Sequence, residues 1–133
     1  MSKGNTTEVD ILAKIFKATA ISWDAATDLD IHLHTADPGE AGVSTTSEAT
    51  YTSYALVQVN RAGTDWSGTN PLANAVLIQF PQCTGGTNTI SHVSITPAGS
   101  TQILYSGALV ASLDVSSGIQ PQFAIGALTV SED

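Results

Sequence analysis

Hydrophobic and polar residues alternate most clearly between residues 29 and 35. Apolar side chains hold the odd positions of this stretch as far as Leu33, and polar side chains hold all the even ones. A period of two predicts a β-strand with one face in the core and the other in water. The turn residues Asp37-Pro38-Gly39 follow and end the strand. The pattern assigns these residues to two faces: Leu29, Ile31 and Leu33 inward, and Asp30, His32 and His34 outward.

Further stretches after residue 50 have the apolar and β-branched content of strands, and turn residues separate them. Gly85-Gly86, Pro97-Ala98-Gly99 and Ser106-Gly107 are among these turns. A succession of about eight strands with a turn every 8–12 residues predicts an antiparallel β-sandwich or jelly roll. The later predicted strands are 51–60, 75–80, 89–96, 102–105, 109–113, 122–125 and 127–130.

A helical period occurs only near the N-terminus, where it predicts one short helix over residues 5–18. Asn5 is the expected N-cap, and Glu8 three residues later has the spacing of a capping box. A helix of about three turns is marginal alone, so its apolar face must dock on something. That face is formed by Val9, Leu12, Ile15 and Phe16.

Length and charge narrow the class of protein. The 133 residues predict a single domain, 1–133, made of the helix and a β-sandwich over 28–131. The net charge of −8, with four cationic residues, argues against nucleic-acid binding and against anionic membranes. Charged residues make up only 12% of the chain, which favours a surface that contacts other proteins. The lone Cys83 excludes an internal disulfide framework and fits synthesis in the cytoplasm.

Two groups of residues have the composition of a metal site. Asp30, His32 and His34 project from one strand face and could offer a carboxylate and two imidazoles to zinc. The alternative is a hydrated face or a subunit contact. Asp37, Glu40 and Glu48 flank a glycine-containing loop, but their spacing does not match an EF-hand, so turn formation is the better interpretation.

Catalytic signatures are missing from the sequence. Cys83 has no base or cationic residue near it in the chain, and no serine lies in a nucleophile elbow. We therefore expect no enzyme activity, no cofactor and no resident metal. A sugar-binding platform built from the tryptophan and tyrosine residues is a minor alternative.

Five segments resemble a family of small virion proteins encoded by tailed bacteriophages. The segments are 33–42 (LHTADPGEAG), 47–55 (SEATYTSYA), 80–86 (FPQCTGG), 105–109 (YSGAL) and 118–128 (GIQPQFAIGAL). Proteins of this kind are often labelled tail-fibre-like, and some resemble capsid cement or decoration proteins. The chain departs from the family pattern in a shorter connection over residues 21–28.

The resemblance implies a structural protein of the virion. The leading hypothesis is a cement protein on the outer surface of the capsid that stabilises the shell. Its partners would then be the major capsid protein and further copies of itself, as a dimer or trimer. The alternative is a tail or tail-fibre component that binds a glycan on the host surface.

Three surfaces are predicted to make protein contacts. The first is the apolar helix face described above, the second is the loop 37–51, and the third is the last strand, 127–130. The residues chosen from them are Val9, Leu12, Ile15, Phe16, Asp37, Pro38, Glu40, Tyr51, Leu128 and Val130.

Overall fold

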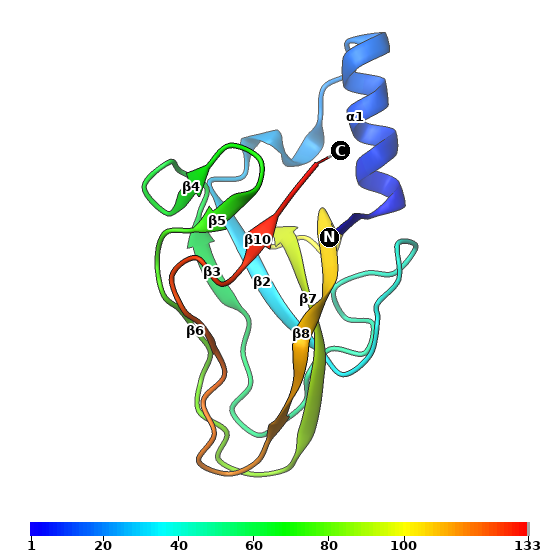
Figure 1. Cartoon of the computed structure of the whole chain (residues 1–133). Helices are drawn as coiled ribbons and strands as arrows, with labels where there is room; N and C mark the ends of the chain where they lie inside the picture. Colours follow the sequence, from blue (N-terminus) through cyan, green and yellow to red (C-terminus); the bar gives the residue numbers. More distant parts are fainter. Residues whose placement is uncertain (133) are drawn as a thin grey trace.

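The computed structural model describes residues 1–132 and has a five-stranded antiparallel sheet at its centre (Figure 1). Strands β2 and β7 lie in the middle of this sheet, and their register pairs Ile31 with Ile95 and Leu33 with Val93. In spatial order the strands are β1 (Ser2–Lys3), β8 (Tyr105–Val115), β7 (Asn88–Pro97), β2 (Asp28–His34) and β3 (Val57–Asn60).

Two small antiparallel sheets form a second layer over one face of the central sheet. Ile78 and Leu128 from this layer pack in the same core as Ile31 and Val93. The mainly β, two-layered fold predicted from the sequence is therefore confirmed. One small sheet contains β10 (Thr129–Val130), β5 (Leu72–Asn74) and β4 (Trp66–Gly68), and the other contains β6 (Ile78–Gln79) and β9 (Gln122–Phe123).

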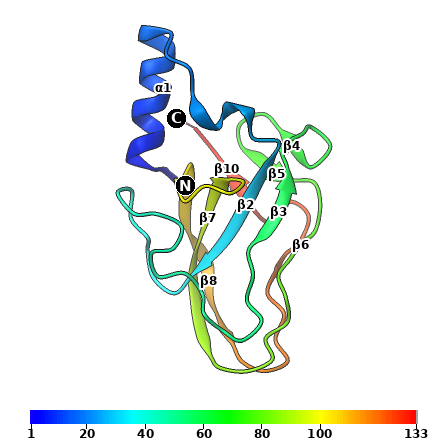
Figure 2. The ribbon, with the colours of Figure 1, turned by 180° about the vertical axis from the view of Figure 1, so that it is seen from behind.

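Helix α1 (Asn5–Lys17) extends from one end of the β body, and the view from behind shows the same separation (Figures 1 and 2). A 3₁₀ turn, η1 (Ser22–Ala25), follows it and leads into β2. The N-cap is Gly4 rather than the predicted Asn5, and no side chain caps the helix. Gly4 is buried, and a Cβ atom there would collide with the carbonyl of Ile103, so close packing selects glycine.

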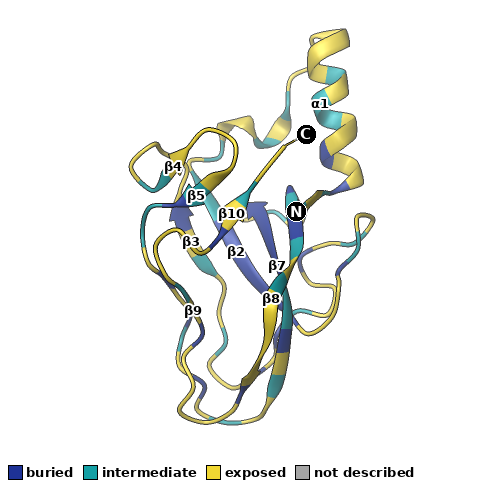
Figure 3. Cartoon of the chain, viewed as in Figure 1, coloured by how far each residue is buried: buried dark blue, intermediate teal, exposed yellow. Residues whose placement is uncertain are grey.

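The prediction of an outward, hydrated face on β2 is wrong. Asp30 and His32 are each 4% exposed and His34 is fully buried, so this strand is covered on both faces (Figure 3). The reason is that a long loop, residues 35–56, folds back over His32 and His34, while Gln58 and the turn at Gly99 contact Asp30. The backbone of this loop joins the end of β2, where Ala49 N donates to Leu33 O at 2.8 Å.

Several predicted strand bounds and one predicted turn are also wrong. Ser106 and Gly107 lie inside β8, because they pair with Ser94 and Val93 of β7. The long β8 contains a bulge in which residues 109–112 stand opposite Ser91 alone. Only 57–60 of the predicted strand 51–60 is a strand, and only 78–79 of 75–80.

Candidate functional site

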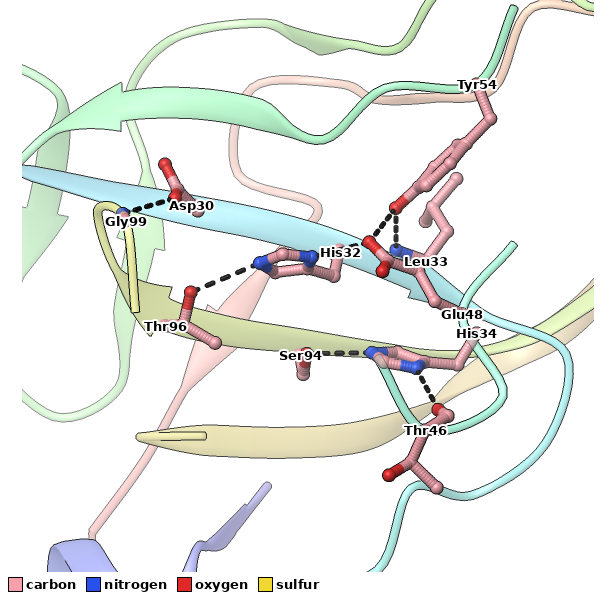
Figure 4. Close-up of polar contacts among 10 residues, drawn as sticks. All are labelled: Asp30, His32, Leu33, His34, Thr46, Glu48, Tyr54, Ser94, Thr96 and Gly99. Atoms are coloured by element: carbon pink, nitrogen blue, oxygen red, sulfur yellow. Dashed lines mark hydrogen bonds and ion pairs between the residues drawn. The ribbon is translucent and has the colours of Figure 1, made fainter. Parts of the chain in front are cut away.

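The two histidines of β2 form the centre of a buried polar network (Figure 4). His32 Nδ1 lies 2.7 Å from Glu48 Oε1, and its Nε2 lies 3.1 Å from Thr96 Oγ1. His34 Nδ1 lies 2.9 Å from the carbonyl oxygen of Thr46, and its Nε2 lies 2.7 Å from Ser94 Oγ. Since a carboxylate and a carbonyl oxygen only accept, each Nδ1 donates, and the Nε2 of a ring that carries a single proton accepts from the hydroxyl beside it.

Glu48 and Tyr54 extend the network into the covering loop. Tyr54 Oη donates to Glu48 Oε1 at 3.1 Å and accepts from the backbone N–H of Leu33 at 3.0 Å. Burial of the Tyr54 phenol raises its pKa above the ordinary value. Burial likewise lowers the pKa of His34, so this ring stays neutral at pH 7.

Asp30 is the third polar group of β2, but it lies apart from the histidine contacts. Its Oδ1 accepts from Gln58 Nε2 at 3.0 Å, and its Oδ2 accepts from the backbone N–H of Gly99 at 2.9 Å. The carboxylate therefore holds the turn after β7 against β2. Its partners are two protein donors, and the His32 and His34 rings turn to other residues (Figure 4).

This network fits a structural role better than zinc coordination. All four imidazole nitrogens are within hydrogen-bond distance of protein atoms. Within residues 1–132, no group of three or more histidine, cysteine, aspartate or glutamate side chains has the arrangement of a metal site. No buried side-chain nitrogen or oxygen of these residues is left without a partner. A network satisfied in this way fixes the loop on β2.

The loop after β2 forms a turn, as its residues indicate. Asp37 Oδ1 accepts from the N–H of Gly39 at 2.8 Å, the hydrogen bond of an Asx turn. Asp37 and Glu40 are exposed, Pro38 is buried, and Glu48 is engaged with His32. The three acidic residues weighed for calcium therefore do not converge.

Cys83 is buried at 1% exposure, and its thiol lies 3.1 Å from the carbonyl oxygen of Gly85. A buried thiol that donates to a carbonyl is not prepared for nucleophilic attack. This geometry fits a structural role for Cys83.

Helix α1 is attached to the β body by its polar side. Thr7 Oγ1 donates to the carbonyl of Ile103 at 2.8 Å, and Asp10 Oδ2 accepts from Trp23 Nε1 at 3.0 Å and from Gln102 Nε2 at 2.9 Å. Thr7 is the one helix residue that is fully buried. The hydrogen bonds that hold the helix in place are thus made by Thr7 and Asp10, polar residues of the kind that normally faces water on an amphipathic helix.

The apolar side of α1 is exposed. Among residues 1–132 nothing covers the predicted face, and each of its side chains is more than half accessible to water. The exposed fractions are 65% for Val9, 56% for Leu12, 65% for Ile15 and 77% for Phe16. A soluble helix normally buries such a face, whereas α1 leaves it in water.

The remaining residues chosen from the sequence divide into surface and core. Tyr51 and Leu128 are 3% and 2% exposed, so their selection as contact residues does not fit the fold. Tyr51 packs edge to face on Tyr54 and donates to the carbonyl of Pro81, while Leu128 belongs to the core between the layers. Val130 is half-buried.

A hollow of about 480 Å³ opens between α1 and the β body. Trp23 and Trp66 border it, and the guanidinium of Arg61 lies 5.6 Å from the centre of the Trp23 ring. Sequence reasoning missed this feature because its walls come from distant parts of the chain. Its apolar walls include Ile11, Trp23, Leu29, Trp66, Leu72 and Val130.

Comparison with known proteins identifies the family. A family model described as "Podophage GP4 fiber I protein gp80" matches residues 2–131. The chain belongs to this fibre protein family. Among curated proteins, none matches.

Membership in the fibre protein family confirms the resemblance to phage virion proteins and supports a structural role. It does not distinguish a capsid cement protein from a fibre component. In residues 1–132, no helix has the length and apolar character needed to cross a membrane.

Sequence reasoning also missed the partners of the β2 histidines in this fibre protein. Ser94 and Thr96 of β7 are polar residues two positions apart, the same period as His32 and His34. Two strands with matching polar faces are the signal of a buried polar layer. The pairing of β2 with β7 was needed to recognise it.

Proposed function

We propose that this protein is an assembling subunit of a bacteriophage fibre, joined to neighbouring proteins through the exposed apolar face of α1. The observation that carries this proposal is the orientation of α1. Its polar side is used to hold the helix on its own β body, and four large apolar residues are left in water. The family is described as a fibre protein, and this description is compatible with a place in the fibre.

A capsid cement protein is the second candidate, and the composition favours it. Charged residues are only 12% of the chain, and a shell-binding protein gains avidity from many weak contacts. In that case α1 would bind the major capsid protein on the outer surface of the head. Self-association as a dimer or trimer suits both candidates.

Glycan binding by the fibre has less support than protein binding. Sugar platforms present aromatic faces to water, but Tyr51 is buried and Tyr54 is half-buried. Arg61 lies over the Trp23 ring. We therefore assign the main contacts of this subunit to protein neighbours and give it no catalytic role.

Incorporation into virions tests the proposal. Phage particles are assembled in cells that supply either the natural protein or a Leu12→Ser, Phe16→Ser double variant, and the purified particles are probed for the protein. We expect the double variant to be lost from particles while remaining folded, because both side chains are exposed. Val110→Ser on β8 is the matched control, since Val110 is a fully exposed apolar residue outside the helix.

Immunogold labelling of the same particles separates the two candidates. Gold on fibres supports the leading proposal, and gold over the head supports the cement protein. Full incorporation of the double variant would refute the role of α1 in either place.

A further inference from the structure

A surface turn, residues 43–49, forms a cap over the two histidines of β2 (Figure 4). This cap turn supplies the carbonyl of Thr46 and the carboxylate of Glu48, which are the acceptors for the two Nδ1 atoms. Ser47 lies between these two residues and has a φ of 51°, in the left-handed region that serine seldom adopts. The histidine contacts therefore hold a strained turn in place.

His34 is fully buried under the cap turn, and its contacts require the neutral ring. In that ring Nδ1 donates to the carbonyl of Thr46 and Nε2 accepts from Ser94 Oγ at 2.7 Å. A proton added at Nε2 makes this nitrogen a donor, so the Ser94 hydroxyl has to turn its hydrogen elsewhere. Ser94 is 0% exposed, so no water takes that hydrogen while the cap turn is closed.

Two other imidazoles lie close to the His34 ring. The centroid of the His32 ring is 6.5 Å away, and His92 stands opposite His34 in the register of β2 with β7. A charge on either ring disfavours a charge on His34. His92 also lines a hollow with Asp37 and Glu40, which are exposed residues, so water screens their charges.

The carboxylate of the cap turn gives His34 little compensation. Glu48 Oε1 lies 2.7 Å from Nδ1 of His32, so this charge is directed at the other histidine. Burial has the largest effect on His34 and lowers its pKa; the hydrogen bond to Thr46 and the charge of Glu48 oppose this effect, and the neighbouring imidazoles add to it. A positive His34 is therefore costly while the cap turn is closed.

The cap turn is the part of this environment that is free to move. Two backbone hydrogen bonds of 2.8 Å tie it to β2, from Thr35 N to Ser47 O and from Ala49 N to Leu33 O. Residues 45–47 are exposed, so water reaches the histidines once the turn lifts. On the other side of the rings, β7 is joined to β2 by six residue pairs and also to β8, so it cannot move without breaking the central sheet.

We propose that the cap turn is a pH-sensitive switch, closed over neutral His34 and lifted when this ring takes up a proton in mild acid. The proton comes from solvent and binds Nε2, and the open turn lets water solvate the resulting imidazolium. The bridge between Val43 and Gln102 marks the end about which the turn swings. The switch is independent of the assembly role of α1, and it changes the shape of the loop 35–56.

Opening of the cap turn should depend on pH because the His34 ring has a different pKa in the two states. In the open state water surrounds the ring, so its pKa moves toward the ordinary value of 6.5, whereas the closed state keeps it lower. Below pH 6.5 the open state thus binds more protons, and the opening equilibrium should rise by up to about tenfold for each pH unit. Above pH 6.5 it should hardly change.

Amide hydrogen exchange followed by NMR on the full-length chain tests the switch. The N–H groups of Thr35 and Ala49 report on the cap turn, and their exchange rates are divided by those of an unstructured chain at the same pH to give protection factors. From pH 7.5 to pH 5 both protection factors should fall by the factor given above, while Ile95 in the central sheet keeps its protection. Unchanged protection of Thr35 and Ala49, an equal fall at Ile95, or a fall that persists after return to pH 7.5 overturns the proposal.

Variants assign the effect to one ring. His34→Asn keeps an N–H near Thr46 and does not titrate in this range, so protection of the cap turn should no longer depend on pH. His92→Asn is the matched control, since His92 is a half-buried neighbour whose removal should leave the fall in place. A fall of the natural size in His34→Asn overturns the proposal. If His34→Asn does not fold, His32→Asn decides: the fall should persist in it, and its disappearance would show that His32 operates the cap turn instead.

Discussion

Replacement of Thr7 by valine should release α1 from the β body without unfolding the body. Thr7 is 1% exposed, and its hydroxyl donates to the carbonyl of Ile103 at 2.8 Å and accepts from Gln102 Nε2 at 3.1 Å. Valine has nearly the same shape and a similar helix propensity, so the change removes the hydroxyl and little else.

The change in the free energy of docking follows from the two hydrogen-bond partners that the Thr7 hydroxyl leaves behind. Gln102 Nε2 keeps its bond to Asp10 Oδ2, whereas the Ile103 carbonyl loses the side-chain partner that reaches it. A buried acceptor without a partner costs about 1–3 kcal/mol. The equilibrium between docked and released helix should shift by the same amount, about 5- to 150-fold.

Hydrogen exchange followed by mass spectrometry measures this shift. Peptides from residues 5–17 should exchange faster by that factor in Thr7→Val, while peptides from β7 should exchange as in the natural protein. Thr6→Val is the matched control, because Thr6 is an exposed neighbour in the same helix turn. Equal exchange of α1 in the two variants would refute the view that buried polar contacts hold the helix.

Three further predictions concern the β body. Phe80→Ala should lower the free energy of unfolding by about 3–5 kcal/mol in urea titration, because Phe80 is fully buried and packs on Tyr54 and Phe123. Phe16→Ala on the exposed helix face should change the free energy of unfolding by less than about 0.5 kcal/mol. Burial lowers the pKa of His34 below 6.5, so the free energy of unfolding should fall as the pH drops below 6.5 toward the pKa of the folded state. In the same titration, the free energy of unfolding of His34→Asn should depend less steeply on pH between 7.5 and 5. An equally steep dependence would refute the assignment of this effect to His34. Addition of EDTA should leave the melting temperature unchanged, since the imidazole nitrogens of His32 and His34 already have protein partners, and a clear fall would revive the zinc hypothesis.

The sequence predicted the elements whose pattern is local. The alternation over residues 29–35 gave the strand β2 almost to its bounds, and the helical period gave α1 within one residue. Both patterns depend only on neighbouring residues. The same is true of the Asx turn at Asp37.

Features that depend on distant contacts could not be predicted in the same way. His32 and His34 were assigned to water because nothing near them in the chain shows that Glu48 and Thr46 fold over them. Ser106-Gly107 has the composition of a turn, yet pairing with β7 makes it part of a strand.

The apolar face of α1 has a part that local pattern predicts and a part that only the folded structure shows. Its residues are evident from their spacing, but which side of the helix meets the body depends on contacts with Trp23 and with Gln102, which is 92 residues from Asp10. The three-dimensional fold was needed to show that Asp10 faces inward and Phe16 faces water.

Solvent access to α1 in assembled particles tests the central claim most directly. A Phe16→Cys variant and a Ser116→Cys control are reacted with a maleimide as free protein and within purified virions. The native Cys83 is buried and reacts slowly in both. The account predicts that Cys at position 16 reacts readily in the free protein and is strongly protected in virions, while Cys at position 116 stays reactive. Equal reactivity of position 16 in both states would contradict it.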